Sequence, residues 1–500
     1  MSHSQIQTED RELPLNQPEN WQVKFPRYMV ELPEHVHDVN VSYIGIQPRY
    51  EENPARGLHT ELNAHVTSAA QRTAAAKVEE WIRQGAGELS PILWEKIYVE
   101  AGYDTPDTEI YILYWVEKDV AKAANKSLNL QQLHKTLSPS DQEVVGLWRE
   151  SFTVPKQRFE TVYSGNDYQP GIASLEGAHQ VSHKFTGYWG AARDRFPASS
   201  HDPFKPEYTL SPPNFEKDSK GRFIEGANKV SVLHIRSGQY WERCKDDERE
   251  AYENTLEPVL RAGMTYLEEN PAESGDIGLR FSRNMTTNRL LQEEEAQQLA
   301  SLNGLGSTVV NGLTNLVKSY AGYLNGSNGV NGVHKDNATN GTNGMKGTNG
   351  TNGVSNTNGS NGTNGVHETN GANGTHEAHS SDSPDSSNGT SATNVNGSNG
   401  VSNGVSKADK FGLVVTTERR RRETCSSGFF RSLKDIEAWA SKHKSHHKIF
   451  HGAHSHSQQF GKETFKMRTW HEVSALKPGE VTFEYINCYP RTGLIPFFEV

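Results

Sequence analysis

The stretch "KVSVLHIRSGQYW", residues 229–241, shows most clearly how this chain folds. It is rich in β-branched and aromatic residues, and polar or charged residues interrupt it at alternate positions, which is typical of a β-strand with one face on a core. Strands that are buried on both faces of a parallel sheet have nearly continuous apolar runs instead. The pattern therefore predicts an antiparallel sheet. Similar runs occur at 41–50, 109–117, 278–286 and 481–489.

Helical patterns lie between these runs. Residues 67–86 are rich in alanine with apolar residues four apart, and residues 246–270 and 432–443 repeat apolar residues at helical spacing. Strands and helices thus alternate along the chain. We predict an α+β fold in which helices cover one face of antiparallel sheets.

A long low-complexity tract interrupts this pattern. Residues 304–406 consist largely of Asn-Gly, Gly-Thr and Gly-Ser units and contribute much of the glycine, of which the whole chain has 44. Such a segment buries too little apolar surface to offset the entropy of ordering, so we predict a mostly disordered insertion. At its start, residues 304–324 place apolar residues along one helical stripe, which favours a short helix docked on its own domain over a partner- or membrane-binding segment. The remainder, about 400 residues, is enough for a substantial core.

Charge and cysteine content exclude some classes of protein. A net charge of −10 argues against a general nucleic-acid binder, and we interpret the basic run Arg419–Arg422 as a solvated patch rather than a nuclear-import signal. The chain contains three cysteines, Cys244, Cys425 and Cys488, without paired spacing, which fits a reducing compartment. The first residues contain no apolar signal-peptide core, and no stretch approaches the ~18 apolar residues of a membrane span. These features predict a soluble, cytoplasmic protein.

Six histidines cluster near the C-terminal end of the sequence. Zinc fingers require paired Cys and His ligands, and catalytic zinc sites commonly have the pattern HExxH; neither occurs here. Spacings of three or four residues would still place several imidazoles on one helical face, where they could bind zinc or copper. The cluster consists of His443, His446, His447, His451, His454 and His456.

A single axial ligand to haem iron requires no spacing motif. One neutral imidazole on a helix with an apolar face toward the macrocycle is sufficient. Trp439, Ile449 and Phe450 could supply that face.

Several motifs together resemble the haem-containing aldoxime dehydratases. "GFFRSLKDIEAWASKHKSHHKIF" (428–450) and "TWHEVSALKPGEVTFEYINCYPRTG" (469–493) are similar to the C-terminal part of that family. Three further motifs precede them in the family order: "TVPKQRFETVYS" (153–164), "GYWGAARDRFP" (187–197) and "HIRSGQYW" (234–241). The likeness extends from about Phe25 to Val500, apart from the low-complexity insertion.

The resemblance implies a domain organisation and a fold. Residues 1–24 would be an N-terminal tail, 25–303 and 407–500 the two parts of a haem dehydratase domain, and 304–406 the insertion. The fold would consist of two ferredoxin-like halves that form an antiparallel, barrel-like sheet with surrounding helices. A homodimer is also implied.

The resemblance further implies a lyase reaction in which an aldoxime, R–CH=N–OH, loses water to give a nitrile. The cofactor would be haem b with ferrous iron in the active form, and it would bind the nitrogen of the substrate. His446 matches the proximal iron ligand, because "SHHKIF" aligns with the family pattern at that point, although the adjacent His447 is a rival.

The resemblance also implies the residues that act on the substrate. His471 matches the distal histidine, which can give and take a proton near neutral pH. Ser237 matches a serine that hydrogen-bonds the substrate oxygen. Arg195 would be the arginine of the distal pocket, with Arg193, two residues earlier, as the alternative.

Three other interpretations stay open at this point. A haem sensor or carrier of the same fold would bind haem and form no nitrile. A peroxidase-like enzyme could also use a distal histidine and arginine. A zinc or copper protein would use the histidine cluster, with His443, His447 and His451 as ligands.

Overall fold

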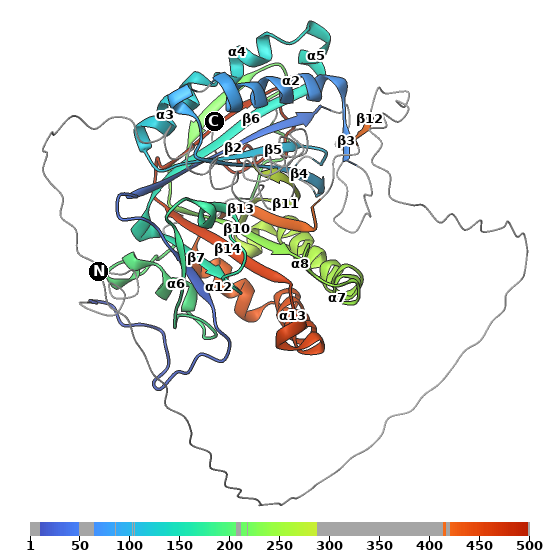
Figure 1. Cartoon of the computed structure of the whole chain (residues 1–500). Helices are drawn as coiled ribbons and strands as arrows, with labels where there is room; N and C mark the ends of the chain where they lie inside the picture. Colours follow the sequence, from blue (N-terminus) through green and yellow to red (C-terminus); the bar gives the residue numbers. More distant parts are fainter. Residues whose placement is uncertain are drawn as a thin grey trace, which may run out of the picture. The chain divides into compact units, whose positions relative to one another are not determined.

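One antiparallel sheet dominates the part of the chain that the structure describes (Figure 1). The structure is a computed structural model and describes residues 11–49, 65–85, 87–102, 104, 106–206, 212–217, 219–287, 414–416 and 421–498. Two short strands pair separately, β3 (His65–Thr67) with β12 (Val414–Thr416). The strands of the large sheet are β1 (Tyr28–Glu31), β2 (Asp38–Pro48), β4 (Leu93–Ala101), β5 (Glu109–Trp115), β6 (Val145–Pro155), β7 (Phe159–Tyr163), β8 (His179–Ser182), β9 (Phe223–Ala227), β10 (Val232–Tyr240), β11 (Asp276–Thr287), β13 (Glu423–Phe430), β14 (Arg468–Leu476) and β15 (Val481–Ile486).

Helices connect these strands. The α-helices are α2 (Ala69–Glu80), α3 (Lys118–Ser127), α4 (Leu130–Lys135), α5 (Pro139–Val144), α6 (Ala191–Arg195), α7 (Asp246–Ala251), α8 (Glu257–Glu269), α9 (Pro271–Ser274), α12 (Leu433–Lys442) and α13 (Lys444–Thr464). Short 3₁₀ or π-helical turns are η1 (Trp81–Gly85), η2 (Gly87–Leu89), η3 (Lys156–Arg158), η4 (Gly171–Ser174), η5 (Pro197–Ser200) and η6 (Tyr252–Leu256).

The strand order repeats itself. The sheet runs β8-β1-β7-β14-β10-β13-β11-β4-β5-β2-β6-β15-β9. Strands β2, β4, β5 and β6 lie in the order β6-β2-β5-β4, and strands β10, β11, β13 and β14 lie in the order β14-β10-β13-β11. If the strands of each group are counted in chain order, the fourth strand pairs with the first, the first with the third and the third with the second. The pairing of β4 with β11 joins the groups into one sheet.

The two faces of the sheet have different surroundings. Because side chains alternate along a strand, Val232 and His234 of β10 face one way and Leu233 and Ile235 the other. The first face carries a large apolar core shared by both strand groups, which includes Val41, Phe152 and Trp470. On the other face, α2, α3 and α4 cover β2, β5 and β6, whereas α8, α12 and α13 cover β10, β11, β13 and β14 (Figure 1). The predicted α+β class with an antiparallel sheet and helices is confirmed.

Helix α13 lies close to α8 and to the preceding turn η6 at two glycines. A Cβ atom at Gly263 of α8 would lie 2.6 Å from Cδ1 of Ile449, and one at Gly452 of α13 would lie 2.9 Å from Cδ1 of Leu256. A side chain at either position would require the facing Cδ1 atom to shift. Small residues at these two positions therefore permit the tight helix pair that backs the sheet.

Some predictions fall outside the described residues. The insertion at 304–406 and its helical stripe at 304–324 do so entirely.

Of the basic run, Arg421 pairs with Glu423 at 2.9 Å and its side chain is only 16% exposed, so the expectation of a solvated patch is wrong at this position. Within the described ranges, no helix has the length and apolar character needed to cross a membrane.

Candidate active site

Two of the predicted site residues lie side by side on the helix-covered face of the sheet. Ser237 of β10 and His471 of β14 are direct partners in the antiparallel register. On the same face Ile235 pairs with Val473, and both contact the apolar cluster under α8, α12 and α13. The sheet thus places a hydroxyl and an imidazole from distant parts of the chain within side-chain reach of each other.

Glu160 of β7 extends this pair by one strand. It is opposite Val473 in the register, diagonal to His471 on the same face. Its Oε1 atom lies 3.3 Å from Nε2 of His471, and its Oε2 atom lies 2.7 Å from Nε of Arg195. Burial raises the pKa of Glu160, but the charges of Arg195 and His471 outweigh burial and lower that pKa to about 2. Glu160 is therefore an ionised carboxylate throughout the physiological pH range.

Arg195 joins Glu160 and His471 from outside the sheet. It ends the short helix α6, and its Nη1 atom donates to the carbonyl of Phe185 at 3.3 Å. Its Nη2 atom lies 3.1 Å from Oε1 of Glu160 and 3.3 Å from Nε2 of His471. Arg193 points elsewhere and bonds to the side chain of Asp194. Of the two predicted arginines, the structure brings Arg195 to the histidine.

The environment of His471 suits both of its protonation states. Without a proton, Nε2 can accept a hydrogen bond from Arg195, and with a proton it can donate one to Glu160. Both partners lie at 3.3 Å, and the His471 side chain is 27% exposed. The imidazole can therefore gain or lose a proton without leaving a partner unsatisfied.

A second histidine lies behind this group. His183 is buried, and its Nδ1 atom accepts a hydrogen bond from the backbone N–H of Phe185 at 3.2 Å. Burial and then the charge of Arg195 lower the pKa of His183 to about 3. His183 is therefore a neutral imidazole that helps to shape the loop from which Phe185 contacts Arg195.

His446 lies on the helical side. Its ring meets the indole of Trp439 edge to face, with centroids 4.8 Å apart, and Trp439 packs on the apolar cluster beneath the sheet. Its Nδ1 atom is buried without a hydrogen-bond partner in the described structure. Burial lowers the pKa of His446, although the carbonyl of Ala440 acts in the opposite direction. The neutral imidazole is the form that binds a metal.

The rival ligand His447 has a different environment. Its ring nitrogen Nε2 bonds to the carbonyl of Ser441 at 2.9 Å. His443 begins the helix: its Nδ1 atom accepts from the N–H of Ser445, and its ring stacks on Tyr266. Across the described segments, no three His, Cys, Asp or Glu side chains converge as a metal site would require.

One part of the predicted apolar helix face is wrong. Ile449 and Trp439 do pack on the cluster beneath the sheet. Phe450, however, is 62% exposed. Successive residues of a helix point about 100° apart, so Ile449 and its immediate neighbour cannot both face the sheet.

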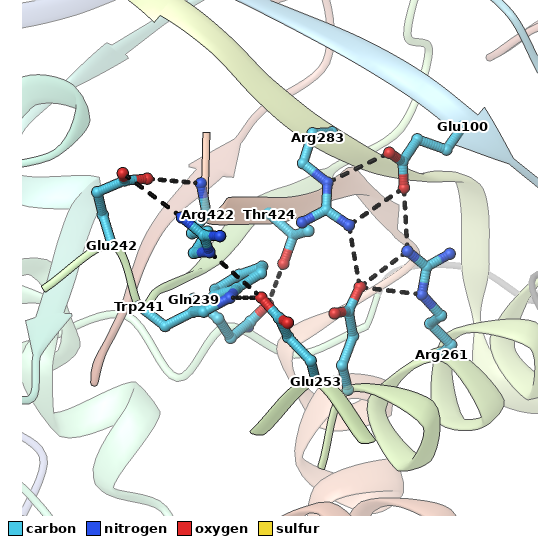
Figure 2. A network of polar contacts seen from close by, with 10 residues as sticks. Glu100, Gln239, Trp241, Glu242, Glu253, Arg261, Arg283, Arg422 and Thr424 are labelled. Carbon is cyan, nitrogen blue, oxygen red and sulfur yellow. Dashed lines mark hydrogen bonds and ion pairs between the residues drawn. The ribbon is translucent and has the colours of Figure 1, made fainter. Parts of the chain in front are cut away.

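A polar network ties α8 to the sheet (Figure 2). Arg283 of β11 and Arg261 of α8 both contact the carboxylates of Glu100 and Glu257. All four side chains are largely buried, and two positive charges balance two negative charges. The network fixes α8 against β11 and β4, and α8 in turn packs against the helix that carries His446.

Comparison with known proteins identifies the family. The sequence model of the haem-containing dehydratases matches residues 42–307 and 361–494. The chain belongs to this family. The resemblance predicted from five motifs is thereby confirmed, and so is the prediction of haem as the cofactor of this dehydratase.

Two relatives of known activity and one solved structure are similar to this dehydratase over half or more of its length. Phenylacetaldoxime dehydratase of Bacillus sp. (strain OxB-1) is 22% identical over 489 residues, which are 97% of this chain and 95% of the relative. Aliphatic aldoxime dehydratase of Pseudomonas chlororaphis is 27% identical over 271 residues, 54% of this chain and 70% of the relative. A crystal structure of aldoxime dehydratase superposes with a TM-score of 0.58 at 20% identity and covers 98% of this chain and 96% of its own. At that identity the superposition shows a shared fold.

The residues of this dehydratase fit a haem between the sheet and α13. On the sheet side, Ile235, Ser237 and His471 are only partly buried, although they lie beneath the helices. On the helix side, His446 offers a neutral imidazole with a buried, unpartnered nitrogen. A flat apolar group with one axial ligand suits this pair of surfaces.

Sequence reasoning missed Glu160 and His183. Glu160 lies within "TVPKQRFETVYS", a stretch that resembles the family. Its carboxylate, isolated among residues typical of a strand, was the one sign in the sequence that this position could have a functional role. Nothing in the sequence marked His183, because its position beside Arg195 depends on the loop between β8 and α6.

Proposed function

We propose that this dehydratase converts aldoximes to nitriles, R–CH=N–OH → R–C≡N + H₂O. Family membership and the names of the relatives support the reaction. The observation that carries the proposal is the cross-strand pair of Ser237 and His471, with Glu160 and Arg195 in contact with the imidazole. This arrangement provides a hydrogen bond for an N–OH oxygen and a proton donor beside it.

His446 is the residue that we assign to the iron. The buried, unpartnered Nδ1 atom of its partly buried imidazole on α13 supports this choice over His447, whose Nε2 atom is already bonded to a carbonyl. Haem, when bound, supplies a ferrous iron as the acceptor for the aldoxime nitrogen. The side chains of Trp439 and Ile449 supply apolar contacts for such a group and exclude water from its surroundings.

The chain's own residues perform the proton chemistry. Hydroxide is a poor leaving group, so the oxygen of N–OH must be protonated as the N–O bond breaks. His471 gives a proton to that oxygen, which leaves as water, and then takes the proton of the aldoxime carbon as the nitrile forms. Protons and charges balance over the cycle, and the histidine is restored.

Ser237 and the ion pair orient this step. The Ser237 hydroxyl donates to the substrate oxygen and holds it toward the imidazole of its cross-strand partner. The ionised carboxylate of Glu160 stabilises the protonated imidazole. Arg195 fixes Glu160 with two hydrogen bonds, so the carboxylate stays directed at His471.

We also propose the finer architecture. The repeated strand order supports two ferredoxin-like halves, one built on β2, β4, β5 and β6 and the other on β10, β11, β13 and β14. The division into a tail (1–24), two parts of one dehydratase domain (25–303 and 407–500) and a disordered insertion (304–406) rests on composition and on the family resemblance. The proposal of a homodimer rests on the family resemblance. The proposal of a cytoplasmic location rests on the composition of the sequence.

An anaerobic assay tests the function. The purified full chain is loaded with haem and reduced with dithionite, and phenylacetaldoxime or butyraldoxime is added while the Soret band is followed and nitrile is measured by chromatography. We expect a shifted ferrous spectrum and many turnovers of nitrile. Haem binding without nitrile from either aldoxime would contradict the proposal and favour a sensor or carrier.

A further inference from the structure

The N-terminal segment 11–21 lies along the part of the chain that carries Arg195. The backbone N–H of Leu13 donates to the carbonyl of Ser200 at 2.8 Å. Nη2 of Arg11 donates to the carbonyl and hydroxyl of Ser199 at 2.9 and 3.0 Å. Trp21 donates from its indole to the carbonyl of Thr186 at 3.1 Å. These contacts run along the whole length of residues 186–200, which contain α6.

Asp194 is the buried centre of this contact. Its side chain is fully buried, immediately before Arg195 in α6. The carboxylate accepts from the backbone N–H of Asn16 at 2.7 Å, from the hydroxyl of Tyr188 at 3.0 Å and from Arg193 at 2.9 Å. A buried carboxylate is costly unless hydrogen bonds satisfy it, so the N–H of Asn16 stabilises this arrangement directly.

Close packing reinforces the contact. Gly187 and Gly190 adopt φ angles of +79° and +89°, and a Cβ atom at Gly190 would lie 2.4 Å from the side chain of Asn16. The ring of Trp21 meets that of Tyr188 edge to face, with centroids 5.6 Å apart. The N-terminal segment therefore fits a surface that only glycines at these turns leave accessible.

Helix α6 needs such external support. It contains five residues, far fewer than a helix requires to be stable by itself. Adjacent side chains on a helix point about 100° apart, so Asp194 can face the N-terminal segment while Arg195 faces Glu160 and His471. A contact on one side of α6 thus sets the position of the guanidinium on the other side.

We propose that residues 11–21 form a strap that positions Arg195 through Asp194. The hydrogen bonds of the strap described above go to residues 186–200, so Asn16 and Asp194 are positioning residues. This inference rests on the proposed function, because it requires that Arg195 act in the distal group.

A matched pair of full-length variants tests the strap. Asn16→Pro removes the backbone N–H that donates to Asp194 at 2.7 Å, whereas Asn16→Ala keeps it and removes only the side-chain contacts of Asn16, of which the one to Oδ1 of Asp194 is 3.3 Å long. We expect Asn16→Pro to lower kcat about 10- to 100-fold, since small displacements of catalytic groups have effects of this size. We expect Asn16→Ala to have a much smaller effect on kcat, because it leaves the 2.7 Å backbone hydrogen bond in place. The Soret spectrum and the aldoxime concentration that half-shifts the Soret band should remain unchanged in both variants, whereas the melting temperature should fall in Asn16→Pro because the buried carboxylate of Asp194 loses a donor. If Asn16→Pro does not fold, Asp194→Asn replaces it with the same expectation.

The double variant with Arg195→Ala separates positioning from a general effect on the fold. If the strap acts through Arg195, Asn16→Pro has no further effect on kcat once the guanidinium is removed. An equal fold loss in both backgrounds would overturn the strap proposal, as would a wild-type kcat for Asn16→Pro. A wild-type kcat for Arg195→Ala alone would instead show that the assignment of Arg195 is wrong, and the strap proposal would fail with it.

Discussion

The two sides of the candidate site are held in different ways. On the sheet side, Glu160, Ser237 and His471 come from neighbouring strands, and backbone pairing fixes the spacing between them. On the helix side, His446 depends on how α13 packs against α8 and α12. Sheet register sets the positions of polar groups relative to each other, whereas helix packing sets the distance of one ligand from the sheet. Substitutions on the sheet side should change chemistry, and those on the helix side should change haem binding.

The largest effect is expected on the helix side. We predict that His446→Ala loses haem, because its ring carries a buried nitrogen without a hydrogen-bond partner and packs on Trp439 near the start of α13. The measurement is the Soret absorbance of reconstituted protein after gel filtration. His447→Ala is the matched control and should retain haem, since Nε2 of His447 already bonds to Ser441. The opposite result in the two variants would reverse the ligand assignment.

The next effect lies on the sheet side. His471→Ala should retain haem and lose about 10²- to 10⁴-fold in kcat, the usual contribution of a general acid–base. Steady-state nitrile formation under anaerobic, reducing conditions measures this. A decrease of less than about threefold would be inconsistent with proton transfer by His471.

Acid stability tests the ion pair beside His471. The pKa of Glu160 in the folded chain is about 2, below its ordinary value of 4.5, so its stabilising contribution is complete above pH 4.5 and is lost as the pH falls toward 2. Between pH 6 and pH 3, the free energy of unfolding of the wild type should fall by about 2 kcal/mol more than that of Glu160→Gln. Urea unfolding at the two pH values measures the difference, and parallel changes in both proteins would contradict the predicted ion pair.

Glu472 provides a control of opposite sign. It neighbours His471 on β14 but faces the other side of the sheet, where burial raises its pKa to about 7 although Arg236 partly offsets this. A raised pKa in a carboxyl group means that stability is lost as the pH rises from 4.5 through 7. The wild type should therefore lose about 3 kcal/mol relative to Glu472→Gln between pH 4.5 and pH 8. Urea unfolding at these two pH values measures the change. With rising pH, the stability of the wild type relative to Glu160→Gln should increase, whereas its stability relative to Glu472→Gln should decrease.

The smallest effect concerns the serine. Ser237→Ala should lower kcat about tenfold, which corresponds to one lost hydrogen bond to the substrate. Ser426 of β13 is its partner on the other neighbouring strand and lies on the same face. Ser426→Ala therefore serves as the matched control and should stay close to wild type. Equal losses in the two variants would mean that general packing on this face, rather than the Ser237 hydroxyl, is responsible.

Much of the fold was predictable because its signals are local. Alternation in 229–241 and in the related runs predicted β10, β2, β5, β11 and β15, and helical spacing predicted α2, α8 and α12. The register between β10 and β14 was not predictable, because no local pattern specifies which residues of two distant strands face each other. Glu160 escaped notice for the same reason: its role arises only when β7 pairs with β14.

The helix side shows the reverse situation. The histidine-rich stretch was conspicuous in the sequence, but the six rings have different surroundings once α13 folds. His446 packs on Trp439, His443 begins the helix, and His451 faces solvent. Composition could locate the stretch, but the choice among its members came from the family motif. Burial alone would not have made that choice, because His456 is the buried residue of the six whereas His446 is partly buried.

One single-turnover experiment tests the central claim most directly. Haem-loaded, dithionite-reduced wild type and His471→Ala are mixed anaerobically with butyraldoxime in a stopped-flow instrument, and the Soret band and the nitrile are followed together. We predict the same rapid Soret shift in both proteins, with nitrile formed only by the wild type on this timescale. Nitrile formation at the wild-type rate by His471→Ala would contradict the claim that this imidazole, placed by the sheet opposite Ser237, transfers the proton that breaks the N–O bond.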